Sequence, residues 1–176
     1  MRILSQPKTQ PPPPFSAAVA SALPLAPCDD IWRDSALRYL GYANELGEAF
    51  KPLAPALYRP SYAVAAMYVL ADTVDKGQRA DARARVKEWP PSRRRSHIGE
   101  QAADTLLWQT AASVAIPGVT INRLVAATKW ACGGNPRLKL VPTAAGLAAI
   151  PLIVTPIDNA VDAAMDATVR PRRPDI

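Results

Sequence analysis

Two stretches of this chain, residues 105–122 and 140–157, contain no charged side chain over eighteen residues each. At a rise of about 1.5 Å per residue, a helix of roughly this length nearly crosses the hydrocarbon core of a bilayer. Both stretches contain prolines and many small residues, which transmembrane helices tolerate because neighbouring helices satisfy the freed backbone groups. The sequence therefore predicts two membrane-spanning helices; two buried helices of a soluble bundle are the alternative.

Charge and hydropathy are strongly segregated along the chain. Hydrophobic residues make up 49% of its 176 residues, yet the mean hydropathy is only −0.04. The net charge of +6 and the pI near 9.6 are compatible with nucleic acid, anionic lipid or an organelle with a basic proteome. Because the basic residues gather beside apolar blocks rather than among exposed aromatic residues, the pattern favours a membrane and argues against nucleic acid.

The chain contains no residue pattern typical of a catalytic or metal site. Its two cysteines, Cys28 and Cys132, do not have metal-ligand spacing, and a single histidine, His97, cannot assemble a zinc site. The adjacent glycines Gly133 and Gly134 lack the Lys and Ser or Thr of a phosphate-binding loop. We therefore expect a protein that is not an enzyme and that binds neither a cofactor nor a metal.

The first 28 residues differ from the rest of the chain. They contain no Asp or Glu and include four consecutive prolines at positions 11–14. Consecutive prolines exclude a helix and favour polyproline II. We expect residues 1–28 to form a flexible proline-rich arm and residues 29–176 to form a helical membrane domain.

An amphipathic helix is predicted to follow Asp34 and to end before Pro52. Its apolar face is formed by residues at spacings of three and four, namely Tyr39, Leu40, Ala43, Leu46, Gly47 and Phe50. Charged residues, including Glu45 and Glu48, fall mostly elsewhere around the helix. Such a helix either lies in a membrane interface or packs on partner helices.

A further span is predicted near residues 57–75, followed by a basic loop at 76–97. The charge-free core of this span, residues 60–71, is short, but Arg59 can snorkel at one of its ends. Pro90 and Pro91 break any helix in the basic segment. Its arginines either bind an anionic headgroup such as cardiolipin or belong to an ordinary solvated loop; the candidate contact residues are Arg79, Arg83, Arg85, Arg93, Arg94 and Arg95.

The remaining spans are expected near residues 103–123 and 140–157. Small residues at intervals of four in the last span suggest a helix-packing face, although simple alanine richness explains them equally; they are Ala144, Ala145, Ala148 and Ala149. Beyond it, Asp158, Asp162 and Asp166 place three carboxylates on one helix face. With three spans, this acidic face and the basic loop share one side of the membrane, and we hypothesise that they face each other or a common partner, with Arg94 and Asp162 as the pair that tests direct contact. A merely solvated acidic face is the alternative.

Four blocks of the sequence carry a family resemblance. They are RYLGYANELGEAF at 38–50, YVLADTVDKG at 68–77, DTLLWQTAASVAIPGVTINR at 104–123 and GLAAIPLIVTPIDNAVDAAMD at 146–166. In order and spacing they resemble the mitochondrial fission process protein 1 family of 18 kDa inner-membrane proteins. The resemblance implies a multi-pass protein of the inner mitochondrial membrane that is linked to division, membrane integrity and bioenergetic coupling, and it implies no catalytic residue.

The sequence as a whole predicts an all-α integral membrane protein with about three transmembrane helices and an N-terminal amphipathic helix. It would act through inner-membrane lipids, including cardiolipin, and through other membrane proteins. The alternative is a structural accessory subunit of a respiratory complex, a supercomplex or ATP synthase, which would use the same helices as packing surface. Lysine and arginine counts are nearly equal on the two predicted sides, so they do not decide the orientation.

Overall fold

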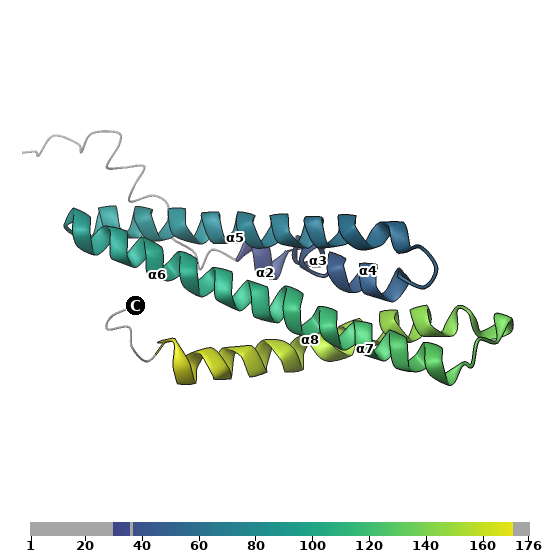
Figure 1. Cartoon of the computed structure of the whole chain (residues 1–176). Helices are drawn as coiled ribbons and strands as arrows, with labels where there is room; N and C mark the ends of the chain where they lie inside the picture. The colour runs from purple at the N-terminus through teal and green to yellow at the C-terminus, as the bar shows by residue number, and fades with distance from the viewer. Residues whose placement is uncertain (1–29, 36, 171–176) are drawn as a thin grey trace, which may run out of the picture.

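Three long antiparallel helical rods make up most of the molecule (Figure 1). In this computed structural model, which describes residues 30–35 and 37–170, every regular element is helical. The rods are α5 (Tyr58–Val86), the continuous run of α6 (Pro91–Gln109), η2 (Thr110–Ala115) and α7 (Ile116–Ala131), and α8 (Val141–Thr168). The all-α prediction is confirmed, whereas the predicted proline-rich arm lies outside the described residues.

The predicted N-terminal amphipathic helix is divided into two short helices, and a third short helix precedes them. These are α2 (Ile31–Asp34), α3 (Arg38–Gly41) and α4 (Ala43–Phe50), and α4 packs against α5, α7 and α8. The Asp30 side chain caps α2 by accepting a hydrogen bond from the Trp32 N–H. Pro52 follows soon after α4, as predicted, and a short 3₁₀ turn, η1 (Pro55–Leu57), leads into α5.

The segment predicted as a basic loop, residues 76–97, is mostly helical. Helix α5 continues to Val86, only residues 87–90 form the turn, and α6 starts at Pro91. Ion pairs at i,i+4 spacing join Asp75 to Arg79 and Asp81 to Arg85, and such pairs favour the helix. Pro91 starts a helix instead of only ending one because the first helical position needs no N–H donor. The loop prediction is therefore wrong, and the segment is a helical hairpin.

Two of the helical segments are long and apolar enough to cross a membrane, Pro91–Ala131 and Pro136–Thr168. The second begins with the 3₁₀ turn η3 (Pro136–Leu138) before α8. Only 33% and 17% of their most apolar windows is buried inside the fold. The core helix of a soluble bundle would be mostly buried, so this exposure favours the membrane interpretation. The third predicted span, near 57–75, is not confirmed, because α5 does not reach the same apolarity.

Both apolar segments accommodate their prolines without ending. Helix α8 runs through Pro151 and Pro156. On the other segment, the π-helical turn η2 lies directly before Pro117. Proline has no N–H for the α-helical bond, and a π-helical turn is one way to rearrange the backbone bonds nearby.

Helices α4, α7 and α8 approach closely at Gly146. A Cβ atom at this position would lie 2.9 Å from Val125 Cγ2 and 3.0 Å from Ala49 Cβ. Glycine therefore permits the contact between α8 and the small apolar cluster of Ala49, Ile121 and Val125. Of the predicted alanine face, Ala149 packs against this cluster and Ala145 is half-buried, but Ala144 and Ala148 are exposed.

Candidate functional site

Helix α4 buries its polar side chains and exposes Leu46, its large aliphatic side chain. Asn44, Glu45 and Glu48 are buried, with Glu45 fully so, whereas Leu46 on α4 is 44% exposed and Tyr39 on α3 is 73% exposed. In water, the apolar face of an amphipathic helix packs inward. The observed orientation is the reverse of that arrangement and suits a helix whose outer surroundings are apolar.

The same reversal extends along α5 and α6. Asp72, Gln109 and Ser113 are buried between the helices. Large apolar side chains cover the outer surface instead, and they include Val64, Met67, Leu70, Val74, Leu106, Leu107, Ile116, Val119 and Leu152. A polar interior beneath an apolar surface is the distribution expected of a protein solvated by lipid.

The first of two buried polar networks centres on the Glu48 carboxylate. The Tyr62 hydroxyl donates to Glu48 Oε1 at 2.9 Å, and Asn122 Nδ2 donates to Glu48 Oε2 at 2.7 Å. Lys51 Nζ lies 3.4 Å from the same Oε2. Glu48, Tyr62 and Asn122 come from α4, α5 and α7, so this one carboxylate ties three helices together.

A second network runs across α5, α6 and η2. Gln109 Nε2 donates to Asp72 Oδ2 at 2.5 Å, and the Ser113 hydroxyl donates to Gln109 Oε1 at 2.5 Å. Lys76 Nζ lies 3.3 Å from Asp72 Oδ1 and 2.6 Å from Asp30 Oδ2. The lysine therefore offsets the buried Asp72 charge and also fixes the start of α2.

Glu45 is the buried acid whose oxygens remain unpaired. Neither carboxylate oxygen has a hydrogen-bond partner within the described part of the chain. Burial raises the pKa of Glu45 to about 8, and the charge of Asp158 adds to this shift. At neutral pH the folded protein therefore holds Glu45 largely protonated.

The acidic face of α8 is paired within the chain. Arg38 pairs with Asp158, which brings α3 against α8. Arg170 Nη1 lies 3.1 Å from Asp162 Oδ1 and 2.7 Å from Asp166 Oδ1, and Arg170 Nε lies 3.2 Å from Asp104 Oδ1 on α6. These carboxylates raise the pKa of the Arg170 guanidinium, the hydrogen bond that it donates to Asp104 being the largest cause.

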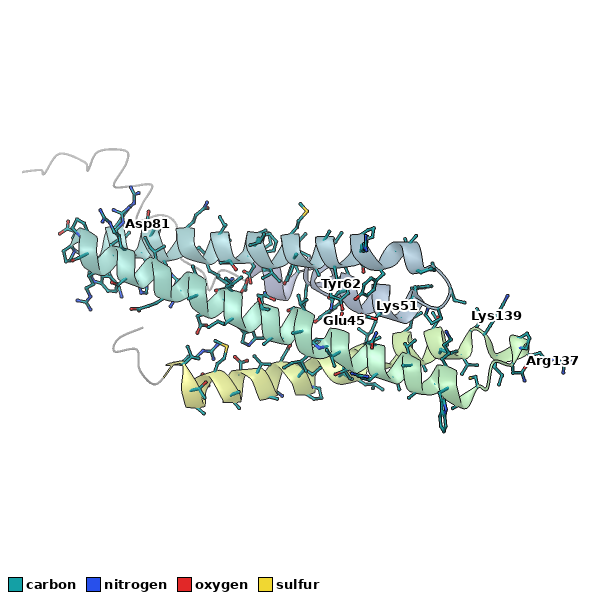
Figure 2. All side chains as sticks on the ribbon, in the orientation of Figure 1. Glu45, Lys51, Tyr62, Asp81, Arg137 and Lys139 are labelled. Carbon is teal, nitrogen blue, oxygen red and sulfur yellow. The ribbon has the colours of Figure 1, made fainter. Side chains whose placement is uncertain are left out.

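The hypothesised pairing of Arg94 with Asp162 is not found. Arg94, at the start of α6, pairs instead with Asp81 on the adjacent antiparallel helix α5. Asp81 lies in the hairpin in Figure 2, and its pKa is lowered chiefly by the hydrogen bond from Arg94. The basic segment and the acidic end of α8 do lie toward the same end of the molecule (Figure 1).

Of the other predicted contact residues, some are paired and some are free. Arg79 pairs with Asp75 and Arg85 with Asp81. Arg83, Arg93 and Arg95 are exposed and have no carboxylate partner among residues 30–35 and 37–170. The segment thus contains both neutralised and unpaired arginines, which alternate along the two arms of the hairpin.

An aromatic residue organises the tip of the hairpin. The Arg93 guanidinium lies 4.4 Å and Lys87 Nζ lies 5.1 Å from the centre of the Trp89 ring. The His97 ring meets Trp89 edge-on at 5.1 Å. These cation–π contacts hold two unpaired cations side by side at the turn between α5 and α6.

The buried networks are not predicted by the sequence, in which Glu45 and Glu48 fall mostly outside the apolar face of their helix. Helical periodicity identifies the two faces but not which of them points inward. Within the part of the chain that the structure describes, no group of three His, Cys, Asp or Glu side chains is arranged to hold a metal ion.

Together these features define a helical protein of membrane type, with two candidate spans, a polar interior and a basic hairpin. The family described as mitochondrial 18 kDa protein matches residues 31–165, and the chain belongs to this family. The family description and the names of the relatives indicate no catalytic function.

Relatives from several animals match over most of the chain. The protein named mitochondrial fission process protein 1 of Homo sapiens is 44% identical over 153 residues, which cover 84% of this chain and 90% of the relative. Its namesake in Caenorhabditis elegans is 44% identical over 147 residues, which cover 80% and 87%. An uncharacterised protein of Acanthamoeba polyphaga mimivirus is 28% identical over 138 residues. No solved structure matches the chain.

Proposed function

We propose that this chain is a non-catalytic, multi-pass protein of the inner mitochondrial membrane that acts in mitochondrial fission and in membrane integrity. Relatives that match four-fifths or more of the chain are named mitochondrial fission process protein 1. The observation that carries the membrane part of the proposal is the reversed polarity of α3 and α4, which bury Glu45 and Glu48 and expose Tyr39 and Leu46.

The protein acts in this proposal through contacts rather than chemistry. Three helices, α5, α6–α7 and α8, span the inner membrane, and α4 fills the gap between them. The exposed apolar side chains contact acyl chains, and the unpaired basic residues contact anionic lipids such as cardiolipin or acidic partner proteins.

Extraction and rescue test the two parts of the proposal separately. Alkaline carbonate should leave the protein in the membrane pellet of isolated mitochondria, and release into the supernatant would remove the membrane assignment. In cells depleted of the endogenous protein, the mitochondrial network should become elongated, and expression of the wild-type chain should restore mitochondrial division. A mitochondrial network whose shape is unchanged by depletion would contradict the fission role.

A structural accessory subunit of an oxidative-phosphorylation complex is the second candidate. A specific observation favours it: an open apolar groove of about 360 Å³ between α4 and α8, lined by Tyr39, Tyr42, Leu46, Leu147, Ile150, Pro151, Val154 and Thr155, offers packing surface for a partner helix. Native gels of gently solubilised mitochondria discriminate the two. Constant co-migration with a respiratory complex or ATP synthase supports the subunit, and free or dimeric protein supports the fission factor.

A further inference from the structure

The polar ends of three helices extend well past the apolar part of the bundle. On α6 the uncharged stretch begins at Thr105, and Arg93 precedes it by twelve residues. On α5 the charge-free stretch ends at Ala71, and Arg83 follows it by twelve residues. Twelve helical residues correspond to roughly 18 Å, so both arginines stand that far beyond the hydrocarbon core if the apolar stretches lie in a bilayer.

That distance separates the arginines from the headgroups of their own membrane. The headgroup layer adds only about 5–7 Å on each side of the core. The cations therefore lie on the order of 10 Å beyond the lipid surface, whereas the Debye length at physiological ionic strength is about 8 Å. Attraction to the membrane in which the protein is embedded is largely screened at the tip.

The tip nevertheless has the composition of a lipid-docking surface. Its unpaired cations are Arg83, Lys87, Arg93 and Arg95. Beside them Val86 is 85% exposed and Trp89 lies at the turn. An exposed valine and a half-buried indole among basic residues suit the headgroup region of an anionic bilayer, where tryptophan is enriched and each cation adds to the attraction.

We propose that the hairpin tip, residues 83–97, docks on the anionic surface of a second bilayer that faces the membrane in which the chain is embedded. The inference rests on the membrane assignment of the proposed function and adds to it the partner of the basic hairpin. Arg79 and Arg85 are paired with Asp75 and Asp81 within α5, and Arg94 of α6 pairs with Asp81 across the hairpin. The unpaired ones make the contact.

Vesicle tethering tests this directly. The full chain is reconstituted in phosphatidylcholine liposomes, and trypsin cleavage of the hairpin gives the fraction with the tip outward. A second, differently labelled vesicle population consists of phosphatidylcholine alone, phosphatidylcholine with phosphatidylserine, or phosphatidylcholine with cardiolipin at equal charge. Energy transfer between the two populations should appear with both anionic compositions, be absent with the neutral one and fall steeply with added salt.

A matched pair of variants shows whether tethering depends on the cations of the tip or on the positive charge of the whole protein. The triple variant K87Q/R93Q/R95Q should lower the extent of tethering at least tenfold, since each cation near an anionic surface contributes about fivefold in binding. The triple variant K129Q/R137Q/K139Q removes three exposed cations from the other end of the molecule, where Figure 2 shows Arg137 and Lys139, and should tether like the wild type. Equal tethering by the two variants would overturn the proposal.

Other outcomes separate this inference from the proposed function. If the protein enters the liposomes with its tip outward but tethers no anionic vesicles, the inference fails and the membrane assignment stands. If the tip captures a polyglutamate chain and no vesicle, its partner is an acidic protein and the inference is wrong. If the chain does not enter the liposomes and is removed by carbonate, the membrane assignment itself fails.

Discussion

Glu45 shows how one buried side chain reports on the surroundings of the fold. It is fully buried and its carboxylate has no hydrogen-bond partner among the described residues, so the charged form would cost several kcal/mol to keep there. The folded protein avoids this cost by holding the proton, as the pKa near 8 indicates. Stability therefore depends on pH through this residue.

The sign of that dependence follows from proton binding. Between the ordinary glutamate range and about pH 8, the unfolded chain releases a proton that the folded chain keeps. The free energy of unfolding should then fall as pH rises through this window, by up to roughly 1.4 kcal/mol per pH unit. Glu45→Gln should remove this slope: the variant should match the wild type near pH 5 and be more stable near pH 8.

Thermal unfolding in detergent at several pH values measures this effect. Glu88→Gln is the control, because Glu88 is exposed at the hairpin turn. A wild-type protein whose unfolding temperature is the same at pH 5 and pH 8 would contradict the role assigned to Glu45.

At the scale of helices, Gly146 permits the close contact of α8 with α4 and α7. A Cβ at Gly146 would lie within 3.0 Å of Val125 and Ala49, so a larger residue must push α8 away from α4 and α7. Gly146→Leu should destabilise the protein by about 1–3 kcal/mol, as overpacking of a tight contact does. Ala148→Leu, at an exposed position on the same helix, should be nearly neutral. Thermal unfolding of both variants in the same detergent provides the measurement, and equal losses would contradict the close packing at Gly146.

The end of α8 depends on a single arginine. Arg170, just beyond the end of α8, joins Asp162 and Asp166 of that helix to Asp104 on α6, and it is the cation that offsets the repulsion among these three carboxylates. Arg170→Gln should therefore increase hydrogen exchange in residues 158–168 and leave the hairpin turn at 87–90 unchanged. Arg137→Gln, at the opposite end, is the control. Unaltered exchange near residue 162 would show that packing alone holds this helix end.

The sequence predicted the helices better than their contacts. Periodicity and uncharged length located the two apolar segments because those signals are local. The hairpin was missed since a proline pair was interpreted only as a break, although Pro91 at a first helical position favours a new helix. The pairing of Arg38 with Asp158, 120 residues apart, depends on how α3 and α8 pack, which no local pattern records. For α4, helical periodicity separated the apolar face from Glu45 and Glu48 but did not decide which of the two points inward.

For the whole molecule, the surrounding solvent decides whether the apolar side chains of each helix are stable on the outer surface. The hydrogen bonds of the two networks around Asp72 and Glu48 stabilise the bundle only if the surroundings offer no better partner, as in lipid. The outward side chains of all three rods should then contact acyl chains. Met67 on α5, Val119 on α7 and Leu152 on α8 are 71%, 61% and 72% exposed and represent one rod each.

Lipid-depth measurements can settle the number of spans. With both native cysteines replaced by serine, single cysteines at positions 67, 119 and 152 are labelled with an environment-sensitive fluorophore in proteoliposomes. The fluorescence of all three labels should be quenched by lipids that carry quenchers in their acyl chains. Labels on cysteines that replace Arg95 or Ala163, which lie beyond the uncharged stretches, should instead be quenched by soluble iodide. Quenching at 119 and 152 without quenching at 67 would reduce the protein to two spans and place α5 against the membrane surface. In that arrangement the polar interior around Asp72 would open toward water, and its hydrogen bonds would lose the protection that makes them stabilising.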